Sequence, residues 1–253
     1  DQKNRFKLFL TNTLETDPVP ALTLLPELSN ENKEANAVKE KCPPLVVCGN
    51  PPYERSSMNQ TKFISKLMEY YKEPVIKEKN LQPLDNDYLK FLRFAHEKIL
   101  QNGQGVIGMI TSNAYLDGTV TRGVREKMLN DFNLIYIVNL HGSVRAKGKL
   151  EGKKNENVFD IQQGVSIVFL IKNGEKNGGK IFYQDLWGTR EEKYDFLSKN
   201  TVYDPGWTEL KPSEPFFMFR PFEEKAEYQN FTPFSKIFND KKAGVTTGRD
   251  EFI

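Results

Sequence analysis

Residues 45–53 read Leu-Val-Val-Cys-Gly-Asn-Pro-Pro-Tyr, a short apolar run followed by a stiff polar turn. The run has the length and composition of a buried β-strand. Two consecutive prolines fix the backbone after it and end the strand. Because open α/β sheets bind ligands at the carboxyl ends of their strands, this stretch predicts a strand that delivers a ligand-binding turn.

Four further runs are similarly rich in Val, Ile, Leu or Phe, and we expect them to be strands covered on both faces: Phe6–Leu10, Val106–Thr111, Leu134–Leu140 and Val165–Ile171. Helical spacing of apolar residues predicts helices over Tyr88–Leu100, capped from 85–87, and after Thr121. Residues 54–84 are expected to form a helix plus a loop. This alternation predicts an α/β fold with a largely parallel sheet.

The C-terminal part differs in composition, because prolines alternate with aromatic residues after about residue 181. We expect an extended segment there rather than more sheet. The predicted domains are therefore 1–185 and 186–253.

Composition excludes several classes of protein. The 253 residues contain 36 Lys plus Arg and 34 Asp plus Glu, a net charge of +2, so any nucleic-acid surface must be local. No apolar run is long enough to cross a membrane. Cys42 and Cys48 are too few for a disulfide scaffold and lack further ligands for zinc, which favours a reducing cytoplasm. The chain begins Asp-Gln-Lys without Met, and we expect it to be a piece of a longer protein.

The tetrapeptide Asn50-Pro51-Pro52-Tyr53 suits methyl transfer to a conjugated nitrogen, which is a poor nucleophile. The Asn50 amide oxygen and the Pro51 carbonyl could accept the two N–H groups of such a nitrogen and hold it in line with a methyl donor. Tyr53 offers a flat face for a base. The alternative is an ordinary proline-rich turn.

This turn resembles the (D/N/S)PPY motif of the amino-methyltransferases that make N6-methyladenine in DNA. The chain looks most similar to the methylase part of single-polypeptide restriction–modification enzymes. Other matching stretches are FLTNTLE (9–15), GVIGMITSNAYLDG (105–118), NVFDIQQGVSIVFLIK (157–172) and GVTTGRD (244–250). The resemblance implies a partial Rossmann-like, S-adenosylmethionine-dependent methyltransferase sheet.

The resemblance also implies roles for two further residues. Asn12 takes the place of the residue that contacts the adenine ring of S-adenosylmethionine. Phe159 takes the place of the aromatic residue that sandwiches the flipped adenine with Tyr53; the alternative for Phe159 is a plain core residue. Residues 1–185 would be the catalytic, base-binding part of the core, and residues 186–253 a coupler to a target recognition domain.

The family's Gly-rich cofactor loop has no counterpart here. Gly103, Gly105 and Gly108 spell G-x-G-x-x-G, but they follow a helix and lead into a strand, the reverse of a cofactor loop. We therefore expect a sheet lacking its first strands, weak or absent cofactor binding, and self-association through open sheet edges.

Weaker signals surround the predicted site. The loop 141–158 could follow the DNA backbone with its basic residues, or be solvated surface; these residues are Arg145, Lys147, Lys149, Lys153 and Lys154. Asn113 and Tyr115 could line the base pocket. We expect His96 to be surface or partly packed, and His141 to lie at the ligand-binding edge without an identifiable partner.

Three functions remain open from the sequence. The first is adenine-N6 methylation of double-stranded DNA by a restriction–modification enzyme, with an N-terminal methylase segment, nuclease and recognition domain elsewhere in the parent protein. The second is methylation of a protein glutamine amide, because its nitrogen is likewise conjugated. The third is a DNA-binding module without catalysis.

Overall fold

The computed structural model describes residues 7–16, 26–41, 43–53, 58–143, 155–175, 178–204, 206–222, 231–232 and 234–237. The chain divides into two compact units, Asp1–Pro221 and Phe222–Ile253. The described part of the second unit contains one short helix, α6 (Phe234–Ile237). Everything below concerns the first unit.

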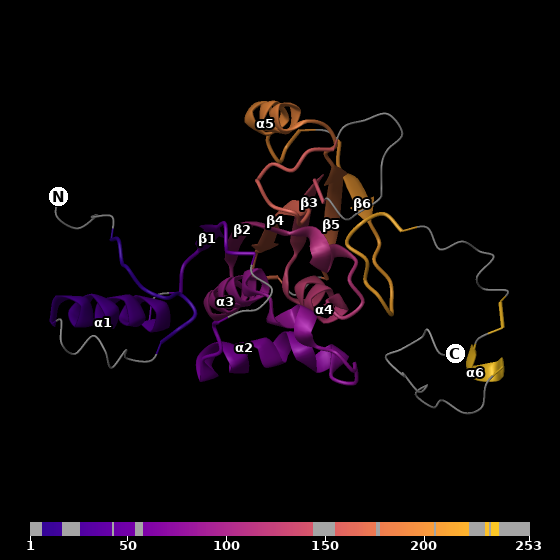
Figure 1. The fold of residues 1–253 in the computed structure, drawn as a ribbon. Helices are drawn as coiled ribbons and strands as arrows, with labels where there is room; N and C mark the ends of the chain where they lie inside the picture. The colour runs from indigo at the N-terminus through magenta and orange to yellow at the C-terminus, as the bar shows by residue number, and fades with distance from the viewer. Residues whose placement is uncertain are drawn as a thin grey trace, which may run out of the picture. The chain divides into compact units, whose positions relative to one another are not determined.

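The first unit is built on a mixed sheet (Figure 1). The helices are α1 (Pro26–Lys41), α2 (Lys62–Lys72), α3 (Asp87–Asn102), α4 (Arg122–Asp131) and α5 (Arg190–Lys199). The strands are β1 (Val46–Gly49), β2 (Gly105–Ser112), β3 (Leu134–His141), β4 (Val165–Lys172), β5 (Lys180–Asp185) and β6 (Thr208–Leu210). Short 3-10 turns are η2 (Glu73–Val75), η3 (Gln82–Asp85) and η4 (Asn113–Leu116).

The order across the sheet is β1-β2-β4-β3-β5-β6. The pairs β1–β2 and β3–β5 are parallel, whereas β4 runs antiparallel to both of its neighbours and β6 runs antiparallel to β5. The α/β class is confirmed, but the sheet is mixed rather than largely parallel. The antiparallel strand is β4, which lies between β2 and β3.

Alternation along the strands separates two apolar layers. Ile135 and Ile137 of β3 face the main core, which α2, α3 and α4 cover, whereas Val138 and Leu140 face a second cluster. Figure 1 shows α3 and α4 beside the sheet with α2 beyond them, and α5 away from these three helices. The predicted helices correspond to α3 and α4, and residues 54–84 contain α2 and the turns η2 and η3.

The turn between α3 and β2 explains the glycine pattern at 103–108. Gly103 ends α3 with φ 78°, and Gly105 has φ 146°. A Cβ on Gly105 would lie 2.5 Å from the carbonyl oxygen of Leu45. These glycines make a tight helix-to-strand turn, as expected, and not a cofactor loop.

Two strand predictions need correction. Residues 7–10 are not a strand, and Leu8 and Leu10 are more than 80% exposed, because no strand among the described residues pairs with them. The strand β1 is present but not covered, since Val46 is 64% exposed and β1 forms one end of the described sheet.

The region after residue 181 also departs from expectation. It contains α5, and β6 pairs with β5 across the predicted boundary at 185/186, so sheet continues beyond it. The assignment of 186–253 as a coupler stays a prediction. None of the described helices is long and apolar enough to span a membrane.

Candidate functional site

Four strands end at one edge of the sheet. Because β4 is antiparallel to both β2 and β3, those two run in the same direction, and β1 and β5 run parallel to them. The segments that follow these strands therefore lie along one edge, the usual place for ligands in α/β sheets. Asn50–Tyr53 follows β1, and His141 ends β3.

The turn after β1 presents its polar groups to solvent. Asn50 is exposed, Pro51 is buried and Tyr53 is half-buried. The Tyr53 hydroxyl donates a hydrogen bond of 3.1 Å to Asn50 Oδ1. Burial raises the pKa of Tyr53 to about 12, so the hydroxyl keeps its proton at neutral pH and can fix the direction of the amide oxygen. An amide oxygen has a second lone pair and can accept another N–H.

The rings of Tyr53 and Phe159 contact each other at a tilt. Their centroids are 6.5 Å apart and their planes differ by 47°. A flat base between two parallel rings needs two carbon–carbon contact distances, about 7 Å in all. The centroid distance is close to this value, but both a rotation to parallel planes and a separation of the rings would be needed to admit a base.

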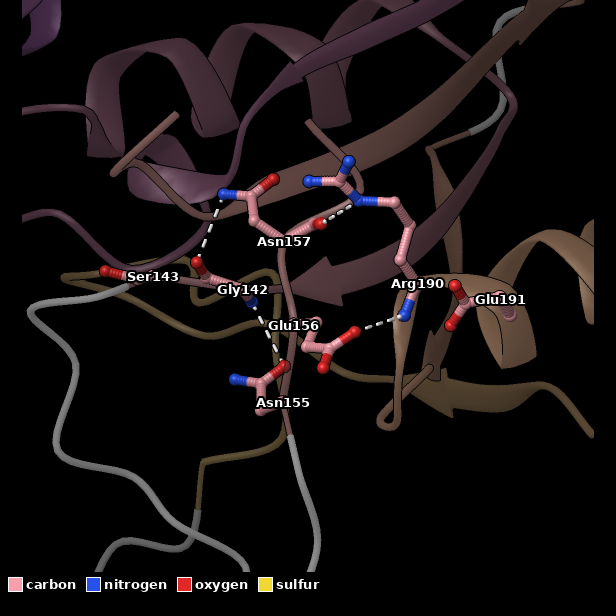
Figure 2. Close-up of a pocket in the computed structure, with 7 residues that line it drawn as sticks. All are labelled: Gly142, Ser143, Asn155, Glu156, Asn157, Arg190 and Glu191. Carbon is pink, nitrogen blue, oxygen red and sulfur yellow. Dashed lines mark hydrogen bonds between the residues drawn. The ribbon is translucent and has the colours of Figure 1, made fainter. Parts of the chain in front are cut away.

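The loop before β4 carries Phe159 and lies against the Asn50–Tyr53 turn. Phe159 is half-buried and packs on the second apolar cluster with Val158 and Val165. Gln163 Nε2 donates to the Tyr53 carbonyl over 3.1 Å. Asn157 of this loop lines a cavity of about 500 Å³ (Figure 2), together with Gly142, Ser143, Asn155, Glu156, Arg190 and Glu191.

Asn12 lies in an exposed turn near the start of α2. Its Oδ1 accepts from the Leu14 amide, and its Nδ2 donates to Asn59 Oδ1 over 3.0 Å. Lys39 from α1 donates to its carbonyl. The side chain is thus oriented by its neighbours while remaining exposed.

Several predicted features fall outside the described residues. The basic side chains at 145, 147, 149, 153 and 154 are among them, as are Cys42 and Gly244–Asp250. Their roles stay predictions. Among the described residues, no group of three or more His, Cys, Asp or Glu side chains could hold a metal ion.

His141 has partners that the sequence did not reveal. Its Nε2 lies 2.6 Å from Asp185 Oδ1, and its ring stacks on Trp187 with centroids 3.5 Å apart. Tyr183 donates to the same carboxylate oxygen. The three partners lie on or just after β5, a strand the apolar pattern did not predict, so the strand-end position of His141 was the only available signal.

This histidine borders a cavity of about 440 Å³. Asn113 lines it too and donates to Asn139 Oδ1, whereas Tyr115 is fully buried in the main core. Neither Tyr53 nor Phe159 lines this cavity, so a role of Asn113 or Tyr115 in a base pocket stays a prediction.

The expectation for His96 was wrong. It is fully buried, with Nδ1 2.9 Å from the Tyr71 hydroxyl and Nε2 3.0 Å from Asp131 Oδ2. Desolvation by burial lowers the pKa of His96 against the opposing effect of Asp131.

Comparison with known proteins finds a family that resembles part of this chain. Residues 26–146 match the family described as Eco57I restriction-modification methylase. The matched segment includes the Asn50–Tyr53 turn, β2 and β3.

Individual proteins are also similar to parts of this chain. A Type II methyltransferase, M.BstVI of Geobacillus stearothermophilus, is 23% identical over 167 residues, which are 65% of this chain and 26% of the relative. The Type ISP restriction-modification enzyme LlaBIII, solved bound to DNA, is 30% identical with a TM-score of 0.66, covering 81% of this chain and 15% of its own. A nuclease-deletion mutant of LlaGI, a Type ISP enzyme solved with a DNA substrate mimic, shares the fold, with 24% identity and a TM-score of 0.73 over 89% of this chain and 22% of its own.

These relatives confirm the Rossmann-like methyltransferase fold of the sheet. The chain spans about a quarter or less of the length of each of them.

Proposed function

We propose that this chain transfers a methyl group from S-adenosylmethionine to N6 of adenine in double-stranded DNA, as part of a bacterial restriction–modification enzyme. The observation that carries the proposal is the pairing of an Asn-Pro-Pro-Tyr turn at the end of β1 with an aromatic ring 6.5 Å from Tyr53. The match of residues 26–146 to the restriction-modification methylase family supports it.

The turn would act on the exocyclic amine through two acceptors. Asn50 Oδ1 and the Pro51 carbonyl oxygen would each accept one N–H of N6, which favours a lone pair on nitrogen directed at the methyl group. The Tyr53 hydroxyl, held in its protonated form, would orient Asn50. No strong base is needed, because proton loss can follow transfer.

The two rings would bind the base itself. N6 cannot be reached inside a duplex, so the adenine must leave the stack at a cost of a few kcal/mol. Stacking on Tyr53 and Phe159 would offset this by about 1–3 kcal/mol per base.

The described residues fit one wall of a cofactor site. S-adenosylmethionine would supply an electrophilic methyl group. Asn12 is exposed and oriented, and one of its two side-chain N–H groups is used by Asn59, so the other could bind an adenine ring nitrogen. The outer edge of β1 is exposed, and we propose that a segment of the parent protein with the first strands and the Gly-rich loop completes the pocket there.

The proposed partners follow from the same arrangement. DNA would lie along the carboxyl edge of the sheet, and the basic side chains between residues 145 and 154 would add phosphate contacts. Residues 1–185 would be the catalytic part and 186–253 the coupler to a target recognition domain, with a nuclease elsewhere in the parent chain. The open edge of β1 would pair with the missing methylase segment, or with a second copy in its absence.

Methyl transfer to synthetic DNA tests the proposal. Full-length protein, labelled cofactor and duplex DNA should yield N6-methyladenine on nucleoside mass spectrometry. Asn50→Ala should abolish the product, whereas Asn200→Ala, at an exposed helix end, should not. Methylated glutamine in a protein substrate without methylated DNA would refute the proposal in favour of the amide alternative.

A further inference from the structure

The loop that carries Phe159 is organised around one asparagine. Asn157 Nδ2 lies within hydrogen-bond distance of three carbonyl oxygens, those of Gly142 (3.1 Å), Ile161 (2.9 Å) and Gln163 (2.7 Å), so one of its two N–H groups is shared between acceptors. Its Oδ1 accepts from the Phe159 amide over 3.0 Å. A single side chain therefore closes the loop on both sides of Phe159. Figure 2 shows the Asn157 amide directed at the Gly142 carbonyl.

A second side chain links this loop to the turn after β1. The Gln163 carbonyl accepts from Asn157, and its Nε2 donates to the Tyr53 carbonyl. Two successive hydrogen bonds, from Asn157 to Gln163 and from Gln163 to Tyr53, thus connect the loop of Phe159 to the backbone of Tyr53. Gln163 and Tyr53 are 110 residues apart in the sequence.

The start of α5 supports the loop from outside. Arg190 Nε donates to the Asn157 carbonyl over 2.9 Å, a contact also drawn in Figure 2, and its Nη2 lies 2.7 Å from Asp160. Thr189 and Glu192 form a capping box that fixes this helix start. The exposed Arg190–Asp160 pair adds little by itself, so the main constraint is the bond to the Asn157 backbone.

We propose that Asn157 and Gln163 are positioning residues that set the separation and orientation of the Tyr53 and Phe159 rings before a base enters. This inference rests on the proposed function, and it assigns no contact with the base to either residue. Among the described residues, the hydrogen bond from Gln163 to the Tyr53 carbonyl joins the two ring-bearing segments. Misplacement of about 1 Å can lower a rate by orders of magnitude.

The chemistry of each side chain supplies a specific test. Met at position 163 nearly matches Gln in length but cannot donate to the Tyr53 carbonyl. Asp at position 157 has the size of Asn and can still accept from Phe159, but it places an acceptor in front of three carbonyl oxygens. The neighbouring Gln162 is exposed, so Gln162→Met is the matched control.

The experiment uses the full-length protein with 4-fluorophenylalanine at position 159. Gln163→Met should lower kcat about tenfold with KM for DNA changed less than about threefold, and should shift or broaden the ¹⁹F resonance in the absence of DNA. Gln162→Met should change neither. Asn157→Asp should show the same pattern with a larger resonance change.

Two outcomes overturn the inference. In the first, Gln163→Met has the same ¹⁹F resonance and the same kcat as Gln162→Met. In the second, thermal unfolding shows that less of the Gln163→Met protein is folded, by an amount that accounts for its lower kcat. Because the resonance is read without substrate, this result is separate from the proposed function, which fails if the wild-type protein does not methylate adenine.

Discussion

Phe159→Ala should remove one face of the proposed base clasp. The ring lies 6.5 Å from Tyr53, nearly the spacing that a sandwiched base requires. Loss of one stacking face costs about 2 kcal/mol, the middle of the range for aromatic–base contacts. That corresponds to a fall of about 30-fold in kcat/KM for DNA methylation.

The substitution also changes packing, because Phe159 is half-buried against Val158 and Val165. Phe159→Leu separates the two effects, since leucine fills much of the apolar space but has no flat face. It should keep most of the stability and still lose most of the activity. Tyr203→Ala, which removes a ring that is 94% exposed, should leave both unchanged.

Two assays are used. Steady-state methylation is measured on a duplex with adenine at the target position, and base extrusion is measured on a separate duplex with fluorescent 2-aminopurine there, which has no 6-amino group and is not methylated. Both Phe159 variants should reduce the fluorescence increase on binding. A kcat/KM for Phe159→Leu within threefold of wild type would refute the clasp, and the glutamine alternative predicts that result.

Three further predictions concern stability and the cofactor. Arg125 is fully buried and donates to the carbonyls of Tyr115, Gly118, Phe216 and Phe217. Arg125→Met should lower the free energy of unfolding, measured in urea, by about 3 kcal/mol, because these carbonyls lose their donors. Arg122→Met breaks a partly exposed pair with Glu78 and should cost less than about 1 kcal/mol. Equal losses for the two variants would contradict this prediction. The lowered pKa of His96 means that the folded protein binds fewer protons than the unfolded chain, so stability is present above the unfolded pKa of about 6.5 and falls as pH drops below it. Urea titrations at pH 7.5 and 5.5 should show this loss of stability, and the loss should be smaller in His96→Gln. The groups near the His96 ring are Asp131, Arg93, Glu97, Tyr70 and Tyr71. A stability that does not depend on pH would contradict the prediction and show that Asp131 compensates fully for the burial. Calorimetry of the isolated chain should detect S-adenosylmethionine binding weaker than micromolar, and micromolar binding would disprove the need for a further segment.

Local sequence patterns predicted the elements whose burial follows from their own periodicity. The strands β2, β3 and β4 appear within one residue of the predicted ends, and α3 and α4 lie where helical spacing put them. Local patterns failed where strand formation depends on pairing with a segment far away in the sequence. The run at 7–10 is as apolar as a strand, but Leu8 stays exposed because nothing described pairs with it. The strand β5 was missed because charged and polar residues at its ends interrupt its apolar core.

The candidate site shows the same division. The Asn50–Tyr53 motif and Phe159 could be found from the sequence because each lies close to an apolar run that predicts a strand. The contacts that organise them could not, because Gln163 and Tyr53 are 110 residues apart and His141 and Asp185 are 44 apart. Nor could the burial of His96, whose partner Asp131 belongs to another helix.

A structure of the full-length protein with duplex DNA and a non-transferable cofactor analogue tests the central claim most directly. It should show a target adenine outside the duplex, between the rings of Tyr53 and Phe159, with N6 about 3 Å from both Asn50 Oδ1 and the Pro51 carbonyl oxygen. An adenine held elsewhere on the protein, or one still stacked in the helix while the Asn50–Tyr53 turn faces solvent, would contradict the account.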